Sequence, residues 1–234
     1  MQLVVTGACT ALGQAVLRAI ARRGQLCNAL GVPAPVQRII AVDRVQPAQL
    51  FVDARIEYVR GDYEQPRFLA RMMGVVTDSV FHLAALGCTD DAAVDAAVDG
   101  AAKPGFAGAA MDREAAFSDL DNALLRSLDT TRALLDACGF QTAVPRIVFA
   151  STQAVRSEAG ALPASTEAVC AALCELVLAE SARRGLVDTR CVRLPGVVAL
   201  DAAAEALVEA HEQEALQPPA ARLIDFSERH GPAR

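Results

Sequence analysis

Two glycines near the start of the chain stand where a phosphate could bind. Gly7 and Gly13 lie in the run Thr6-Gly7-Ala8-Cys9-Thr10-Ala11-Leu12-Gly13, which follows a predicted strand and opens a predicted helix. A glycine turn in this context is typical of a dinucleotide fingerprint, because the N–H groups and the positive dipole end of the helix meet the pyrophosphate there. We expect Gly7 to make the tight turn and Gly13 to let helix and strand pack closely. Ala11 and Leu12, at the helix start, complete this predicted phosphate site.

Thr10 occupies the middle of the same turn, where the backbone normally comes closest to the phosphates. Its β-branched side chain either displaces the cofactor or offers its hydroxyl as a compensating donor. We expect weaker binding, by about 1–2 kcal/mol if one charge-assisted contact is disturbed.

The elements that must position this turn alternate between strands and helices. The apolar runs read as buried strands, and the segments between them have helical spacing. Such alternation predicts right-handed crossovers and an α/β fold, a Rossmann-type doubly wound parallel sheet with helices on both faces. The predicted strands are 3–6, 38–43, 56–60, 79–84, 146–151 and 189–194, and the predicted helices are 12–23, 66–73, 115–138 and 165–184.

Asp43 ends the second predicted strand, where a carboxylate can accept hydrogen bonds from the adenosine ribose. Its charge would repel a 2′-phosphate, so NAD is favoured over NADP, while Arg44 beside it keeps NADP from being excluded. For Asp43 or Asp62 alone, a carboxylate that stabilises a turn is an equally good interpretation.

Several motifs in order resemble the extended short-chain dehydrogenase/reductases, and within them the D-erythronate dehydrogenase-like group. The glycine turn matches the family's T-G-x-x-G-x-x-G with Thr10 at the middle glycine, and the resemblance covers residues 1–199, the predicted NAD(P)-binding domain. It implies NAD as cofactor, and it assigns further residues to the cofactor site. These are Asp62 and Tyr63 in Gly61-Asp62-Tyr63, which looks like the family's adenine-contacting Gly-Asp pair, Leu83, Ala84 and Ala85 in the His82-Leu83-Ala84-Ala85 motif, and Pro195 in Arg193-Leu194-Pro195.

The same resemblance implies that two groups needed for chemistry are absent. Thr152 stands at the family's catalytic Ser/Thr position, but Glu167 replaces the acid–base tyrosine and Ala171 replaces the lysine. The register is fixed downstream by Cys174-Glu175-Leu176 and Arg183-Arg184-Gly185. General acid–base catalysis raises reaction rates by roughly 10²–10⁴-fold, so the loss of both groups should lower the rate by a large factor. Glu167 remains a candidate base if burial raises its pKa. In the neighbouring helix, Ser127 replaces the asparagine of the N-L-D-G-T-R motif.

Composition excludes several classes of function. The net charge is −6 with no basic block, which argues against a nucleic-acid partner. No apolar run is long enough to cross a membrane, and no basic leader precedes the first strand, so we expect a cytoplasmic protein. The seven cysteines lack metal-ligand spacing, so no metal site is predicted; Cys170 and Cys174 are interpreted as buried apolar residues. Lys103 is the single lysine.

Two stretches break the pattern of strands and helices. Residues 88–111 are interpreted as an irregular insertion. Residues 200–234 are interpreted as a short tail with one helix at 202–214 and a disordered polar end. The family's substrate domain would follow residue 195, so it is expected to be truncated here. The resemblance also implies a homodimer through the helices at 115–138 and 165–184.

Three functions stay open on the sequence. The first is an NAD(H)-binding protein that is catalytically impaired. The second is an active NAD-dependent oxidoreductase or epimerase acting on a sugar acid or nucleotide sugar. The third is a decayed relative that folds but binds nothing.

Overall fold

The computed structural model describes residues 1–28, 31–45, 50–63, 65, 67–84, 113–156, 163, 165–213 and 221–226, without the side chains of 113–119. Ala85, Lys103 and the expected insertion at 88–111 lie outside the described residues.

A parallel sheet of seven strands forms the centre of the molecule, in the order β5-β4-β1-β6-β7-β8-β9. Every neighbouring pair of strands in it is parallel. The six predicted strands are all present, and their ends differ from the prediction by two residues at most. The strands are β1 (Gln2–Thr6), β4 (Arg38–Asp43), β5 (Ile56–Arg60), β6 (Ser79–His82), β7 (Arg146–Thr152), β8 (Asp188–Leu194) and β9 (Ala221–Asp225).

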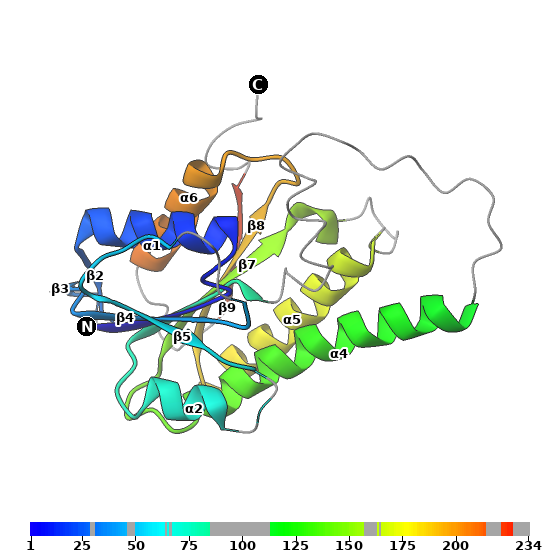
Figure 1. The fold of residues 1–234 in the computed structure, drawn as a ribbon, viewed down its shortest axis with the longest axis horizontal. Coiled ribbons are helices and arrows are strands. Elements are labelled where there is room, and N and C mark those ends of the chain that lie inside the picture. The colour runs from blue at the N-terminus through cyan, green and yellow to red at the C-terminus, as the bar shows by residue number, and fades with distance from the viewer. Residues whose placement is uncertain are drawn as a thin grey trace.

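Helices cover both faces of this sheet (Figure 1). α1 (Ala11–Arg23) and α6 (Leu200–Glu212) lie on one face, and α2 (Phe68–Met73), α4 (Arg113–Cys138) and α5 (Thr166–Arg183) lie on the other. Each face buries its own apolar cluster, because the strand side chains alternate between the two sides. The predicted α/β, doubly wound architecture is confirmed. Within the described residues, no helix is long and apolar enough to cross a membrane.

A short antiparallel pair lies between α1 and β4, where the sequence predicted only a long loop. β2 (Gln25–Cys27) pairs with β3 (Pro33–Pro35). Gly24 ends α1 in the left-handed region, with φ of 69°, and its carbonyl accepts a hydrogen bond from Val36 N at 2.9 Å. The chain therefore leaves α1, turns back through the hairpin and enters β4.

The residues after 199 differ most from the expectation of a separate tail. α6 packs its apolar face into the core beside α1, and β9 adds a parallel strand beside β8. Glu205 accepts hydrogen bonds from Arg22 at 2.8 Å and from Arg23 at 3.0 Å, which ties α6 to α1. The apolar side chains and these ion pairs stabilise the segment, so α6 and β9 belong to the same folded unit as the rest of the sheet.

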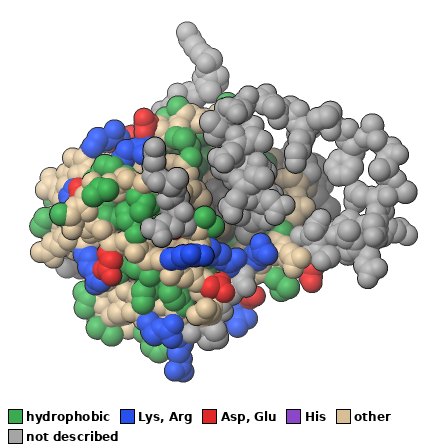
Figure 2. Space-filling model, in the orientation of Figure 1, with side chains coloured by type: hydrophobic (Ala, Val, Ile, Leu, Met, Phe, Trp, Pro, Cys, Tyr) green, Lys and Arg blue, Asp and Glu red, His purple; other side chains and the backbone are tan. Residues whose placement is uncertain are grey.

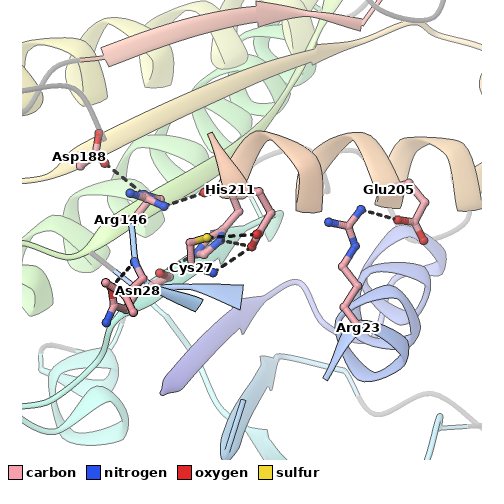
Figure 3. A network of polar contacts seen from close by, with 10 residues as sticks. Arg23, Cys27, Asn28, Arg146, Asp188, Glu205 and His211 are labelled. Atoms are coloured by element: carbon pink, nitrogen blue, oxygen red, sulfur yellow. Dashed lines mark hydrogen bonds and ion pairs between the residues drawn. The ribbon is translucent and has the colours of Figure 1, made fainter. Parts of the chain in front are cut away.

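A buried polar network also holds the C-terminal end of α6 against the sheet (Figure 3). The Arg146 guanidinium contacts Asp188 at 3.1 Å and donates to the carbonyl of His211 at 2.6 Å. Glu212 accepts from the backbone N–H of Cys27 at 3.0 Å. Arg146 thus places its positive charge at the negative dipole end of α6, which favours this position of the helix.

Candidate functional site

The glycine turn between β1 and α1 is built around two positions that exclude a side chain. Gly7 has a φ of 69°, and a Cβ there would lie 2.9 Å from the backbone nitrogen of Ala84. A Cβ on Gly13 would lie 2.3 Å from the carbonyl oxygen of Gly7. The first glycine therefore lets the turn approach the end of β6, and the second lets α1 begin directly against the turn.

Tyr63 holds the glycine turn in place through two hydrogen bonds of its hydroxyl. Its hydroxyl accepts from the N–H of Gly7 at 2.9 Å and donates to the carbonyl of Val42 at 2.7 Å. The side chain is buried, and burial raises the pKa of the Tyr63 hydroxyl well above its ordinary value. The hydroxyl therefore stays protonated and can make both hydrogen bonds. Tyr63, assigned to the cofactor site from sequence, supports the turn in this structure.

Thr10 is the N-cap of α1. Its hydroxyl accepts from Gly13 N at 3.0 Å and donates its proton to the carbonyl of Gly7 at 2.8 Å. The sequence left open whether Thr10 displaces a ligand or donates to it; here the hydroxyl proton is already used inside the turn. The N–H groups of Ala11 and Leu12 make no hydrogen bond to any described residue. Two helix N–H groups thus remain for an anion, which fits a pyrophosphate.

Asp43 lies beside this turn at the end of β4. One carboxylate oxygen accepts from Cys9 N at 2.7 Å, and the other accepts from Arg44 N at 2.7 Å and from Val45 N at 3.3 Å. Asp43 therefore joins the end of β4 to the turn, as a turn-stabilising carboxylate does. Each carboxylate oxygen can accept two hydrogen bonds, so the oxygen that faces Cys9 can still accept one from a ribose hydroxyl.

Arg44 and Asp62 lie next to one another beyond Asp43. Their closest charged atoms are 3.4 Å apart, and the Arg44 guanidinium carbon lies 5.6 Å from the centre of the Tyr63 ring. The structure therefore brings together four of the residues assigned from sequence, Asp43, Arg44, Asp62 and Tyr63, at the ends of β4 and β5.

The end of β6 closes the other side of the turn. Leu83 is buried, and its N–H donates to the carbonyl of Thr6 at 3.2 Å, while Ala84 faces Gly7. His82 contacts the hydroxyl of Thr6 at 2.8 Å and that of Thr131 at 3.1 Å. Burial lowers the pKa of His82 to about 4, so the ring is neutral near pH 7 and orients its neighbours.

At the end of β7, Thr152 keeps a hydroxyl available to a ligand. Its oxygen accepts from Ala154 N at 3.2 Å, and the side chain is partly exposed. The adjacent Ser151 is buried and donates to Glu175 at 2.6 Å, and Arg193 binds both oxygens of the same carboxylate, at 2.9 and 2.6 Å. The ion pair joins α5 to β8, and the hydrogen bond from Ser151 joins α5 to β7. In the sequence, Glu175 stands out only as part of the run that fixes the register, and no local pattern connects it to Ser151 or Arg193.

Glu167 and Ala171 lie on the first two turns of α5, one helical turn apart. Glu167 is exposed, although nearby protein atoms remove enough water to raise the pKa of its carboxyl. Ala171 is 1% exposed. Glu167 thus presents an exposed carboxylate where the resemblance places the tyrosine, and Ala171 presents only a buried methyl group where it places the lysine.

The remaining predicted positions are located as follows. Cys170 and Cys174 are buried on one face of α5, as expected, and Cys174 contacts the hydroxyl of Thr131 at 3.3 Å. Pro195 follows β8 and is partly exposed. Within the described part of the chain, no three His, Cys, Asp or Glu side chains are grouped as metal ligands.

Comparison with known proteins gives sequence relatives and structural neighbours. No family model matches the chain. It is 32% identical over 206 residues to D-erythronate dehydrogenase from Cupriavidus necator, an alignment that covers 84% of this chain and 55% of the relative. The chain spans about half the length of the curated relatives that it matches.

Two solved structures show the same fold. The nucleoside-diphosphate-sugar epimerase from Agrobacterium tumefaciens has a TM-score of 0.58 and 24% identity, over 83% of this chain and 52% of that one. UDP-glucuronic acid 4-epimerase from Bacillus cereus, in complex with NAD, has a TM-score of 0.55 and 16% identity, over 83% and 56%. With its glycine turn, its strand order and its sequence relative, the chain belongs to the extended short-chain dehydrogenase/reductases, the family of the NAD-dependent epimerases and dehydratases.

Proposed function

We propose that this protein binds a nicotinamide dinucleotide at the glycine turn and is catalytically impaired. The observation that carries the proposal is the contrast between a complete turn and an incomplete catalytic helix. Gly7 and Gly13 let the turn form tightly against the end of β6 and the start of α1, and Ala11 and Leu12 present their N–H groups. The NAD complex of the epimerase neighbour supports the choice of ligand class.

Several residues would hold the dinucleotide. The N-terminus of α1 would bind the pyrophosphate through the N–H groups of Ala11 and Leu12. Asp43 would accept a hydrogen bond from the adenosine ribose. Leu83 and Ala84 would form the apolar wall of the cleft, with Pro195 at its far side. When bound, the nicotinamide ring would supply or accept a hydride.

The impairment follows from the side chains on α5. A substrate oxygen at Thr152 could accept a hydrogen bond from its hydroxyl, but among the described residues no phenol lies beside it to move the proton. Among the described residues, no lysine lies near Glu167 to lower a pKa or to hold the nicotinamide ribose. We therefore expect little hydride transfer, even with the dinucleotide bound.

An active oxidoreductase is the second candidate, and the raised pKa of Glu167 favours it. A carboxyl whose pKa is raised toward neutrality is a better proton acceptor at the pH where it ionises. The relative in Cupriavidus necator suggests a sugar acid such as D-erythronate as the substrate class.

A homodimer through α4 and α5 is proposed from the resemblance and from the exposed apolar residues on both helices. Leu125 is 51% exposed on α4, and Leu176 is 66% exposed on α5. The dimer and the cytoplasmic location stay predictions.

The decisive experiment combines a binding titration with an activity assay. Thermal unfolding with NAD⁺ and NADP⁺ should show a rise in Tm, since a ligand at one hundred times its Kd stabilises the native state by about 2.7 kcal/mol. Absorbance at 340 nm with a panel of sugar acids and nucleotide sugars should show no turnover. Binding with turnover would support the active enzyme, and the absence of binding would leave the decayed relative.

A double variant tests whether the rest of the catalytic region is intact. In Glu167→Tyr/Ala171→Lys, we expect detectable hydride transfer with at least one substrate of the panel, because the phenol and the ammonium would return to the register of the family. Leu176→Tyr/Glu180→Lys, with the same spacing farther along α5, is the matched control and should stay inactive.

A further inference from the structure

A pocket of about 470 Å³ lies between α2 and the C-terminal half of α4, and none of its lining residues belongs to the proposed dinucleotide site. Apolar side chains form part of its surface, namely those of Ala70, Ala133, Ala137 and Phe140. Four charged side chains, two of each sign, form the rest. Figure 2 shows basic and acidic side chains together on the lower half of this face, where α2 and α4 lie.

The backbone at Arg67, at the edge of this pocket, is strained. Among the described residues, Arg67 is the one non-glycine residue with a positive φ, of 63°. This left-handed conformation favours glycine, because a Cβ crowds the neighbouring carbonyl oxygen. The exposed side chain of Arg67 does not cap α2, and it makes no hydrogen bond or ion pair with any described residue. Glycine would therefore suit the fold better, and such strain often marks a position kept for a ligand.

A negative charge without a partner lines the same pocket. On α4, Arg132 pairs with Asp129 at 4.0 Å. The side chain of Asp136, one turn beyond Arg132, makes no hydrogen bond or ion pair with any described residue. The pocket thus presents one unpaired guanidinium and one unpaired carboxylate beside an apolar surface. A ligand that matches all three carries a carboxylate, an ammonium group and an apolar body.

We propose that this pocket binds a free α-amino acid with an apolar side chain. Arg67 binds the α-carboxylate, since a planar guanidinium can donate two parallel hydrogen bonds to a carboxylate. Asp136 accepts from the α-ammonium group, and the side chain of the ligand packs against Phe140, which is 58% exposed. The volume of the pocket lies within the range usual for small-molecule sites. The inference does not rest on the proposed function, because the two sites share no residue.

The test is calorimetric titration of the full chain at low salt with phenylalanine and with two analogues that each lack one charge. Phenylalaninamide has no carboxylate, and N-acetylphenylalanine has no ammonium group. We expect phenylalanine to bind and each analogue to bind roughly tenfold more weakly, the cost of about one charge-assisted hydrogen bond. Because a peptide carries only one of the two charges at each end, the same analogues distinguish a free amino acid from a peptide terminus.

Two substitutions at Arg67 separate binding from strain. Arg67→Ala removes the guanidinium and keeps the strained conformation, whereas Arg67→Gly removes both. Both variants should bind phenylalanine roughly tenfold more weakly, but only Arg67→Gly should also raise Tm, by about 2 °C. Asp136→Asn should weaken phenylalanine binding to a similar extent. Arg71→Ala, on the same helix but lining a different pocket, is the matched control and should change neither quantity.

The contrary outcomes are equally specific. If phenylalanine does not bind, or if both analogues bind as tightly as phenylalanine does, the inference is overturned. It is also overturned if Arg67→Gly binds as the parent does, or if this variant unfolds at a lower temperature, since the arginine would then serve the fold. Binding of NAD⁺ should be the same in every variant, so the proposed function stands or falls separately.

Discussion

The glycine turn and helix α5 lie at the same edge of the sheet, and both are held by buried polar contacts. At the turn, Tyr63, Asp43 and Thr10 hold the backbone that would meet a ligand. At α5, Ser151 and Arg193 both bind the Glu175 carboxylate and hold the helix against β7 and β8. The two regions differ at the surface that a ligand would touch: the turn presents free N–H groups, and α5 presents Glu167 above a buried alanine.

In α5, the residues that hold the helix in place are different from the residues at its exposed surface. The polar contacts below α5 depend on Glu175 and Arg193, and neither position 167 nor position 171 takes part in them. Side chains at positions 167 and 171 can therefore change without loss of the contacts that hold the helix. The turn has no such separation, since the backbone that forms it is also the surface that would bind.

The largest expected effect comes from a side chain added inside the turn. Gly7→Ala places a Cβ 2.9 Å from the backbone of Ala84 at a φ of 69°, so we expect a loss of about 2–5 kcal/mol in unfolding free energy and no dinucleotide binding. Gly31→Ala is the matched control: its φ is 75°, but a Cβ there meets nothing within 4 Å. Chemical denaturation and calorimetry check both variants. Equal losses in the two would mean that the left-handed conformation, and not the close approach, limits the turn.

The framework below α5 should be nearly as sensitive. Glu175→Gln leaves the Arg193 guanidinium, 12% exposed, beside a neutral amide. We expect a loss of about 3 kcal/mol, because removing one charge from a buried pair leaves the other uncompensated. Glu180→Gln, in an exposed pair on the same helix, should change stability little. A stable Glu175 variant in denaturant titrations would show that apolar packing alone holds α5.

His82 connects the two regions, because it contacts Thr6 in β1 and Thr131 in α4, and Thr131 contacts Cys174 in α5. Its pKa is lowered to about 4 in the folded protein, so protons bind the unfolded chain more readily. The stabilisation is present above pH 6.5 and is lost as the pH falls toward 4, by roughly 3 kcal/mol. Denaturant titrations from pH 7.5 to 4.5 should show a smaller loss in His82→Asn. The same slope in both proteins would assign the pH dependence to other groups.

Thr10 should have the smallest effect on stability and an opposite effect on binding. Thr10→Gly removes the N-cap hydroxyl and frees Gly13 N, so stability should change by less than about 1 kcal/mol. The affinity for a dinucleotide should rise several-fold, because a third N–H group becomes available and the β-branched side chain is gone. Thr10→Ser keeps the cap and loses only the methyl branch, so its affinity should lie between those of the parent and of Thr10→Gly. A Thr10→Gly variant that binds more weakly would show that the cap also orders the bound form.

The fold was predictable where local patterns decide it. β4 and β5 agree with the prediction to the residue, since their apolar runs end at polar strand termini. β9 was not predicted, because its five residues follow a proline-rich stretch and are stabilised by pairing with the edge of β8. The sequence of β9 alone gives no sign that β8 will pair with it.

The candidate site was predictable in its positions but not in its contacts. The sequence placed Asp43, Asp62 and Tyr63 at the ends of neighbouring strands, which the structure shows. Two contacts join residues more than fifty positions apart. The Tyr63 hydroxyl binds the N–H of Gly7, and Arg126 from α4 lines a pocket together with Asp62. These contacts follow from the packing of the chain.

The packing of α6 on α1 has a consequence for how the chain acquires its structure during synthesis. The Glu205 carboxylate that binds Arg22 lies 183 residues downstream of it. The part of α1 that packs on α6 therefore stays uncovered until α6 has been synthesised, although α1 also packs on β1 and β4. Contacts of such long sequence separation slow folding, so we expect the nascent chain to need protection against aggregation until that late step.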